Sequence, residues 1–188
     1  YEIQVWLEFR RVLFRSNRTL AWHKPMDLEK FKSDAANRAR DNKKFLSGLK
    51  KQNPRELDEV FHTAHDTVFE ETDCLQCANC CKTTSPIFYS HDIERLSKAL
   101  RLRPADFIEQ YLRVDEDQDY VLRSSPCPFL QDDNYCSVYD SRPKACREYP
   151  HTDRKKIFQI MDLTYKNTMV CPAVLKIVDR VRQQLDEQ

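Results

Sequence analysis

Glycine is the residue that this sequence most lacks. Gly48 is the single glycine in 188 residues, where ordinary usage of about 7% would give roughly 13. Loops that hold phosphate groups need glycine at several fixed positions, so the sequence excludes P-loop and dinucleotide-binding sites. Such low glycine also favours helices over tight hairpins.

The sequence also lacks a long apolar run and an excess of charge of either sign. No apolar segment approaches the roughly 18–20 residues needed to cross a bilayer. Lysine and arginine number 31 against 30 acidic residues, so no bulk charge draws the chain to nucleic acid or to a membrane surface. We therefore expect neither partner, and we expect a cytoplasmic protein.

The first residues look foreign to the rest of the chain. Residues 7–16 read LEFRRVLFRS, which is the translation of the end of a common sequencing-library adaptor. We therefore expect residues 1–16 to be a non-native leader and exclude them from reasoning about the fold.

Two helices are expected ahead of the cysteines, within a lead-in that covers residues 17–72. Residues 27–51 are charged but carry a moderately amphipathic apolar pattern. Asn53 followed by Pro54 is typical of a helix start, and Leu57, Phe61 and Val68 then fall on one helical face.

Residues 73–188 carry all eight cysteines of the sequence, whose thiolates are typical ligands for metals, so we expect these residues to form a cysteine-cluster metal-binding domain. Helices are predicted from a cap at Ser90, from Pro104 and from Pro172, the last closing the chain. Strand-like composition occurs at residues 120–123 and 135–139, and residues 156–163 fit either a strand or a helix. The predicted fold is mostly α with minor β: an irregular single domain organised around a multi-cysteine metal site and preceded by two helices.

Eight cysteines carry the chemistry of the sequence. Four lie within eight residues in a C-x2-C-x2-C-C run, and four more follow at wider spacing. Thiolates are soft anionic ligands for zinc, iron–sulfur clusters and other thiophilic metals. Disulfide scaffolds are usually shorter than about 100 residues, so the pattern favours metal over disulfides. The candidate metal ligands are Cys74, Cys77, Cys80, Cys81, Cys127, Cys136, Cys146 and Cys171.

Adjacent cysteines limit how such a site is built. Side chains of neighbouring residues diverge, so Cys80 and Cys81 are not expected to bind one tetrahedral ion together. They are expected to go to different metals or to different corners of a cluster, with later cysteines completing the coordination. Two four-thiolate sites, or one polynuclear site with spare thiols, both remain open. The Cys127-Pro128 and Cys171-Pro172 steps resemble the ending of a ferredoxin run and give iron–sulfur a slight preference over zinc.

Other polar residues are weaker candidates. Lys82, Arg142 and Arg147 could offset thiolate charge. His62 and His65 are expected to be helix-surface histidines rather than ligands, and His91 and His151 add little. Acidic residues at 115–119 and 132–133 are expected to be solvated loops. A Cys–His nucleophilic pair would not require seven further cysteines.

The residues around the cysteines resemble one known family. The Cys74–Cys81 run, Cys127-Pro128-Phe129-Leu130, the block from Cys136 through Arg142-Pro143, Cys146-Arg147 and Tyr149-Pro150, and Cys171-Pro172 are similar to the YkgJ-like cysteine-cluster proteins. The resemblance covers about residues 73–172. It implies a zinc- or iron-chelating CxxCxxCC domain of bacterial type, and it implies metal binding more firmly than activity. The flagellin lysine N-methylases carry a similar cluster, but their additional region is not evident here.

The expected function is binding of an iron–sulfur cluster, iron or zinc. Such a site would serve redox chemistry and electron transfer, with a redox protein partner, or metal handling. The alternative is a structural zinc module that acts as a protein-interaction domain. No catalytic constellation is identifiable, so catalytic residues are unknown and an oxidoreductase role stays open. No cofactor site separate from the metal is expected.

Overall fold

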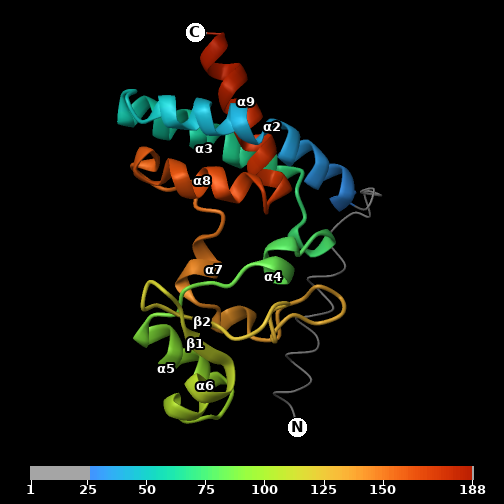
Figure 1. Cartoon of the computed structure of the whole chain (residues 1–188), viewed down its shortest axis with the longest axis vertical. Coiled ribbons are helices and arrows are strands. Elements are labelled where there is room, and N and C mark those ends of the chain that lie inside the picture. Colours follow the sequence, from blue (N-terminus) through green and yellow to red (C-terminus); the bar gives the residue numbers. More distant parts are fainter. Residues whose placement is uncertain (1–25, 188) are drawn as a thin grey trace, which may run out of the picture.

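A computed structural model describes residues 26–187 of the chain. The expected non-native leader, residues 1–16, lies outside this part. Figure 1 shows an elongated molecule in which a group of helices lies at one end and the small sheet at the other. The segment that carries α4 (Asn79–Thr83) and the segment that carries α7 (Lys144–Glu148) connect the two ends, which are called here the helical half and the small half.

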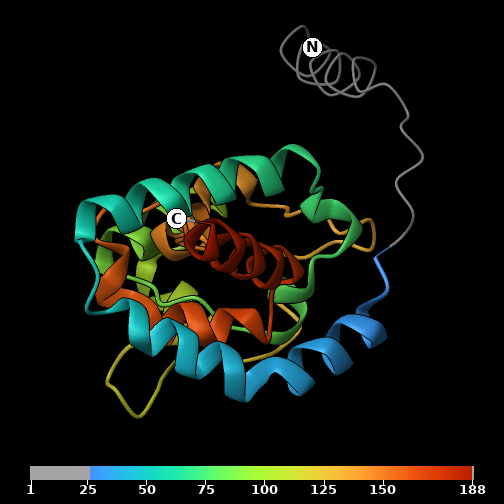
Figure 2. The ribbon, with the colours of Figure 1, turned by 90° about the horizontal axis from the view of Figure 1, so that it is seen from above.

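The helical half consists of four helices that come from both ends of the described chain. They are α2 (Leu28–Leu49), α3 (Pro54–Glu70), α8 (Met161–Thr168) and α9 (Pro172–Asp186). Helix α3 packs on α9, and α2 packs on α8. Seen from above, α9 lies between α3 on one side and α2 with α8 on the other (Figure 2).

The helix starts follow from local chemistry that the sequence predicts. Asp27 accepts a hydrogen bond from the Lys30 backbone N–H at 2.9 Å, and Asn53 accepts one from the Arg55 N–H at 3.0 Å. Pro54 is the first residue of α3, a position where its missing N–H has no partner to lose. Both predicted lead-in helices are therefore confirmed.

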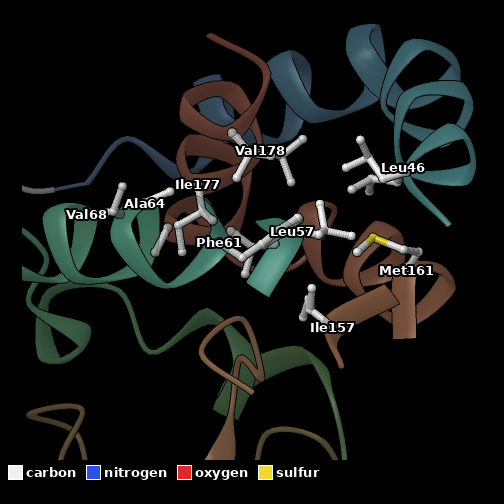
Figure 3. Packing of buried hydrophobic residues seen from close by; sticks show 13 residues of the cluster. Leu46, Leu57, Phe61, Ala64, Val68, Ile157, Met161, Ile177 and Val178 are labelled. Carbon is white, nitrogen blue, oxygen red and sulfur yellow. The ribbon is translucent and has the colours of Figure 1, made fainter. Parts of the chain in front are cut away.

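The core of the helical half consists of apolar side chains. Phe61, Leu57 and Ile177 are almost completely buried, and they face one another between α3 and α9 (Figure 3). Ile157 and Met161 close the core from the side of α8. Burial of this many large apolar side chains is the dominant favourable term in folding, so this half has its own source of stability.

The small half is built around a second, smaller core. It contains α5 (Ser90–Ala99), α6 (Pro104–Tyr111), β1 (Leu112–Val114) and β2 (Tyr120–Leu122). The two strands are antiparallel, with Leu112 opposite Leu122. The buried members of this second core are Phe88, Ile93, Leu96, Phe107, Leu112, Leu122, Phe129 and Val138.

Short helical turns join the two halves. The first connection holds the 3-10 helix η1 (Cys74–Gln76) and α4 (Asn79–Thr83). The second runs through the 3-10 helix η2 (Tyr139–Ser141), α7 (Lys144–Glu148) and the 3-10 helix η3 (Ile157–Ile160).

Hydrogen bonds fasten both connections to the helical half. The Asn79 Nδ2 donates to the Val170 carbonyl at 2.7 Å. The Asn167 Nδ2 donates to the Pro150 carbonyl at 3.2 Å. The Asp58 carboxylate accepts from the Lys156 and Ile157 backbone N–H groups at 2.7 and 2.9 Å.

The predicted fold class, mostly α with minor β in a single domain, is confirmed, whereas two local predictions are wrong. Residues 135–139 are not a strand: Cys136 makes one isolated bridge to Leu130, after which the chain turns into η2. Ser90 is not the cap of α5 but its first helical residue, and Tyr89 is the cap. Residues 157–163 are helical. No helix in the described part is both long and apolar enough to cross a membrane.

Candidate metal centre

The eight cysteines, all within the described residues, come together from separate parts of the chain. Cys74 and Cys77 lie in and after η1, and Cys80 and Cys81 lie on α4. Cys127 and Cys136 flank a turn in the small half, Cys146 lies on α7, and Cys171 is the N-cap residue of α9. All eight are free thiols. Their mutual effects on pKa divide them into two groups.

Group A is defined here as Cys74, Cys77, Cys80 and Cys171. Burial raises the pKa of Cys171 to about 11, and the charges of Cys74 and Cys77 add to the effect. Burial likewise raises the pKa of Cys74, with Cys77 as the first neighbouring thiol. The charges of Cys171 and Cys74 contribute to the raised pKa of Cys80. Cys74, the first of the eight cysteines, therefore lies near Cys171 at the start of α9.

Group B is defined here as Cys81, Cys127, Cys136 and Cys146. Burial raises the pKa of Cys146 to about 12, with contributions from the other three members. Burial raises the pKa of Cys127 to about 11, and Cys81 and Cys136 add to it. The Cys127 backbone N–H also donates to the Cys81 carbonyl at 2.8 Å. This group lies on the side of the second core, against which Cys127 and Cys136 pack.

The two groups meet on α4. The sulfur atoms of Cys80 and Cys81 are 4.0 Å apart, and the strongest effect on the pKa of each of these two thiols comes from the other. The hydrogen bond between them raises the pKa of Cys80 and lowers that of Cys81 to about 7. Arg142 and Lys82 lower the pKa of Cys81 further. Cys81 also acts on Cys74, so the groups are distinct but electrostatically connected.

Backbone N–H groups point at several of the sulfurs. The Asn79 N–H donates to Cys77 Sγ at 3.4 Å. Hydrogen bonds from backbone N–H groups counteract part of the burial effect at Cys127, Cys136 and Cys171, and so lower their pKa values. At Cys171 the donors, Ala173 and Val174, belong to the first turn of α9, where the helix dipole also favours negative charge. Such donors stabilise a thiolate over a thiol.

The cationic side chains near the cysteines act mainly on the thiols of group B. The guanidinium of Arg142 lies 3.4 Å from the ring centroid of Tyr139, and its Nε donates to the Tyr139 carbonyl at 2.8 Å. Arg142 lowers the pKa of Cys81, Cys136 and Cys146, and of Cys74 in group A. Of the three cations suggested by the sequence, Arg142 and Lys82 act on the cysteines, whereas Arg147 is exposed.

A buried ion pair holds the Arg142 segment in place, and sequence reasoning missed it. Asp92 is fully buried and pairs with Arg95 at 2.6 Å. Arg95 in turn donates to the Ser141 and Arg142 carbonyls. Burial raises the pKa of Asp92, but bonds from Arg95 and from the Lys144 and Tyr89 N–H groups outweigh it and hold the pKa below its ordinary value of 3.8. The sequence around Ser90 predicts a helix start but gives no sign that Asp92 is buried and holds the Arg142 segment.

Tyr149 adds a hydroxyl to the surroundings of group A. Its oxygen is buried. Burial raises the pKa of Tyr149, and the charges of Cys171 and Cys80, a hydrogen bond with Cys171 and the charge of Cys77 raise it further. All three cysteines belong to group A. The sequence marked Tyr149 only as part of a motif, because the burial of its hydroxyl beside these cysteines is visible only in a structure.

The thiols are gathered but not arranged around an ion. Within residues 26–187, no three Cys, His, Asp or Glu side chains are spaced to hold one metal. Metal binding would therefore require rotation of cysteine side chains. The donor set itself fits a thiophilic metal, because it consists of thiols with backbone N–H donors and few cations.

The other candidate residues have structural partners. His65 Nδ1 lies 2.7 Å from the Thr152 hydroxyl, and His62 Nε2 lies 3.3 Å from the Arg154 carbonyl. Both histidines thus fasten residues 152–154 to α3. Asp115 accepts from the Asp117 and Asp119 N–H groups at 3.0 Å within its own loop, and Asp133 accepts from the Tyr135 N–H at 3.0 Å. These acidic residues stabilise turns.

Comparison with known families identifies the cysteine-bearing region. Residues 73–172 match the model of the family described as "CxxCxxCC: Putative zinc- or iron-chelating domain". The match covers more than half of the chain and contains all eight cysteines. The chain belongs to this family. The resemblance to YkgJ-like proteins that the sequence suggests is thereby confirmed, since this domain is that family's own. Zinc or iron chelation is accordingly the function that the family supports. No curated protein and no solved structure matches the chain.

Proposed function

We propose that this protein binds two thiophilic metal ions or small clusters, one at group A and one at group B, for metal handling or electron transfer. The observation that carries the proposal is that the other thiols act on one another in two sets, Cys74, Cys77 and Cys171 in one and Cys127, Cys136 and Cys146 in the other, with the adjacent pair Cys80 and Cys81 between them. Four thiolates are the usual complement for structural zinc and for iron–sulfur clusters.

Each group supplies what a metal–thiolate site requires. All the thiols except that of Cys74 are buried or partly buried, so an unpaired thiolate is disfavoured there and a bound cation would offset its charge. Backbone N–H groups at Cys77, Cys127, Cys136 and Cys171 would remain as donors to the coordinated sulfurs. When bound, iron would supply one-electron chemistry, whereas zinc would supply cross-links alone.

A structural zinc module is the second candidate. It is favoured by the way the groups join segments distant in sequence. Group A links α4 to the start of α9, and group B links α4 to α7 and to the turn between Cys127 and Cys136. Metal bound across such segments contributes directly to folding. In this case the metal would stabilise a surface for another protein.

Anaerobic purification followed by metal analysis and visible absorption separates these candidates. Iron–sulfur protein should be brown and should bleach on reduction with dithionite. Colourless protein with two equivalents of zinc and no sulfide, from cells with ample iron, would support the structural module. Protein that binds no zinc and no iron under either condition would contradict the proposal.

A matched pair of variants tests the division into two sites. Cys80→Ser removes a group A ligand and Cys81→Ser removes a group B ligand at the next position of the same helix. We expect each variant to retain about one of two metal equivalents, with different cysteines left unprotected against alkylation. Loss of all metal in both variants would indicate one polynuclear site instead.

A further inference from the structure

Three large apolar side chains are exposed on the two turns that carry Cys74 and Cys136. Leu75 directly follows Cys74 and is 37% exposed. Tyr135 and Tyr139 lie on either side of Cys136 in the sequence and are 43% and 45% exposed. Single exposed apolar residues are ordinary on a protein surface, whereas a contiguous group of them indicates a contact with another molecule. Their meaning therefore depends on whether the two turns lie together.

Contacts between the turns bring these side chains to one part of the surface, which is called here the aromatic patch (Leu75, Tyr135 and Tyr139). The Asn134 Nδ2 donates to the Leu75 carbonyl at 2.6 Å, so its turn lies against η1. The ring centroids of Tyr135 and Tyr139 are 5.7 Å apart, and the Arg142 guanidinium covers one face of Tyr139. Tyrosine and arginine are enriched in interfaces between proteins.

The charges beside the aromatic patch are mostly of one sign. Residues 70–76 and 131–140 contain no lysine and no arginine. Their exposed acidic residues are Glu70, Glu71, Asp132, Asp133 and Asp140. Arg142, which stacks on Tyr139, offsets part of this charge. Negative charge repels nucleic acid and anionic lipid, so the patch fits a protein that carries lysine or arginine around apolar side chains.

The aromatic patch lies where the cysteines are open to an incoming molecule. Cys74 is exposed, whereas the other seven cysteines are buried or partly buried. Cys74 belongs to group A and Cys136 belongs to group B, and the patch includes neighbours of both. A protein bound at the patch would therefore come close to both groups, on the side where a thiol is accessible.

We propose that the aromatic patch is the docking surface for a metal-donor protein, whose own thiolate-bound metal is surrounded by apolar and basic side chains. The inference rests on the proposed metal binding and names the kind of partner that supplies the metal. Transfer is an exchange of ligands that starts at Cys74: each Zn–S bond that forms here replaces one that breaks in the donor. Each thiol that binds loses a proton and each thiolate that the donor releases takes one up, so Zn2+ keeps its charge and protons balance.

The experiment uses two synthetic donor peptides and the full metal-free chain. Both peptides carry biotin, one leucine and a Zn2+-loaded Cys-x-x-Cys pair, which is surrounded by lysines in one peptide and by glutamates in the other. After mixing for set times, streptavidin removes the peptides and the metal left on the chain is measured. The lysine peptide should deliver Zn2+ at least about tenfold faster, because electrostatic steering raises association rates by about 10–1,000-fold. In about 1 M salt, where charges are screened beyond about 3 Å, the difference should disappear.

Variants test whether delivery takes place at the aromatic patch. Leu75→Ala and Tyr135→Ala should each slow delivery from the lysine peptide by at least about fivefold, the effect expected of residues central to an interface. Neither variant should change the affinity for free Zn2+, because neither residue is a proposed ligand. Leu163→Ala is the matched control: Leu163 lies on α8 in the helical half and is 40% exposed. Its substitution should change neither measurement.

The outcomes separate this inference from the proposed function. If wild type binds no free Zn2+, the proposed function fails. If it binds free Zn2+ but accepts metal equally fast from both peptides, the inference is overturned and the proposed function stands. Delivery from a zinc–glutathione complex as fast as from the lysine peptide would also overturn it, as would equal slowing by Leu163→Ala. A dimer of the chain that Tyr135→Ala abolishes would assign the patch to a second copy instead.

Discussion

Group A and group B contain the same number of thiols but depend on different parts of the molecule. Group A is completed by Cys171, which packs against the core of the helical half. Group B is completed by Cys127 and Cys136, which pack against the second core. The helical half has an extensive apolar core, whereas the small half has a two-stranded sheet and short helices. Metal should therefore matter more to the small half than to the helical half.

Removal of metal should give the largest contrast. Structural zinc in small peptides contributes about 10–16 kcal/mol of apparent binding free energy to folding. After chelation, backbone amides around Phe107 and Leu96 should lose most of their protection against hydrogen exchange, while those around Phe61 and Ile177 should keep theirs. His62→Ala, at a partly exposed contact with the Arg154 carbonyl, should lower the thermal midpoint far less. Equal small effects from both treatments would argue against a metal site.

Substitution within the cores tests the same contrast from the other side. Phe61 and Phe107 are each completely buried, one in each core. Phe61→Ala should lower the free energy of unfolding by about 3–5 kcal/mol, as measured in urea, and should weaken metal binding mainly at group A. Phe107→Ala should weaken it mainly at group B. If both variants weaken metal binding at the same group, then each half does not support its own group of cysteines.

The ion pair beneath the Arg142 segment should have a smaller effect. Asp92→Asn removes the charge that pairs with Arg95, and a hydrogen bond to a charged group contributes about 1.5–3 kcal/mol. We expect a fall of that size in the free energy of unfolding and a lower metal affinity at group B. Asp106→Asn is a suitable control, because its pair with Arg103 is exposed and such pairs contribute about 0–1 kcal/mol. Equal effects from both substitutions would show that Asp92 does not hold the Arg142 segment in place.

The order of metal uptake is the smallest difference that we expect. The pKa of Cys81 in group B is lowered to about 7, whereas the pKa values of the other group B thiols and of Cys74, Cys80 and Cys171 in group A are raised. At neutral pH group B thus holds a partly formed thiolate, and group A must release more protons to bind metal. Less than one equivalent of Zn2+ at pH 7 should protect group B from alkylation first, as read by mass spectrometry of peptides.

Metal uptake should also depend on pH with a definite sign. Raised pKa values mean that the metal-free thiols keep their protons at neutral pH, so bound metal displaces protons and affinity rises as pH rises. The ratio of metal affinities of group B to group A should decrease at higher pH, where the group A thiols ionise more easily. A preference for group A at pH 7 would contradict the proposed electrostatic difference.

The sequence predicted the helices better than the turns because caps and apolar periodicity are local signals. Asn53-Pro54 and Pro172 mark helix starts that the structure contains. The strand expected at residues 135–139 is absent. The composition of this segment is typical of a strand, but its backbone pairs at Cys136 alone, in one isolated bridge.

The candidate site was partly predictable for a related reason. The expectation that the side chains of Cys80 and Cys81 diverge is wrong, because their sulfur atoms lie 4.0 Å apart. The expectation that the later cysteines come to the Cys74–Cys81 run needs only the number and type of the ligands. Which later cysteine joins which cysteine of that run depends on how the two halves pack. The same holds for the buried groups around the site, Asp92 and Tyr149, whose partners come from distant segments.

The positions of the two groups along the chain have a consequence for synthesis on the ribosome. Every member of group B precedes Cys171, so group B is complete once Cys146 has been made. Group A waits for Cys171, and the helical half waits for α8 and α9, which supply one side of its core. Domains tend to fold as they emerge, so on the proposed function a nascent chain would complete group B, and the small half that we expect to depend on it, before the helical half. A cell short of metal would then expose the small half first.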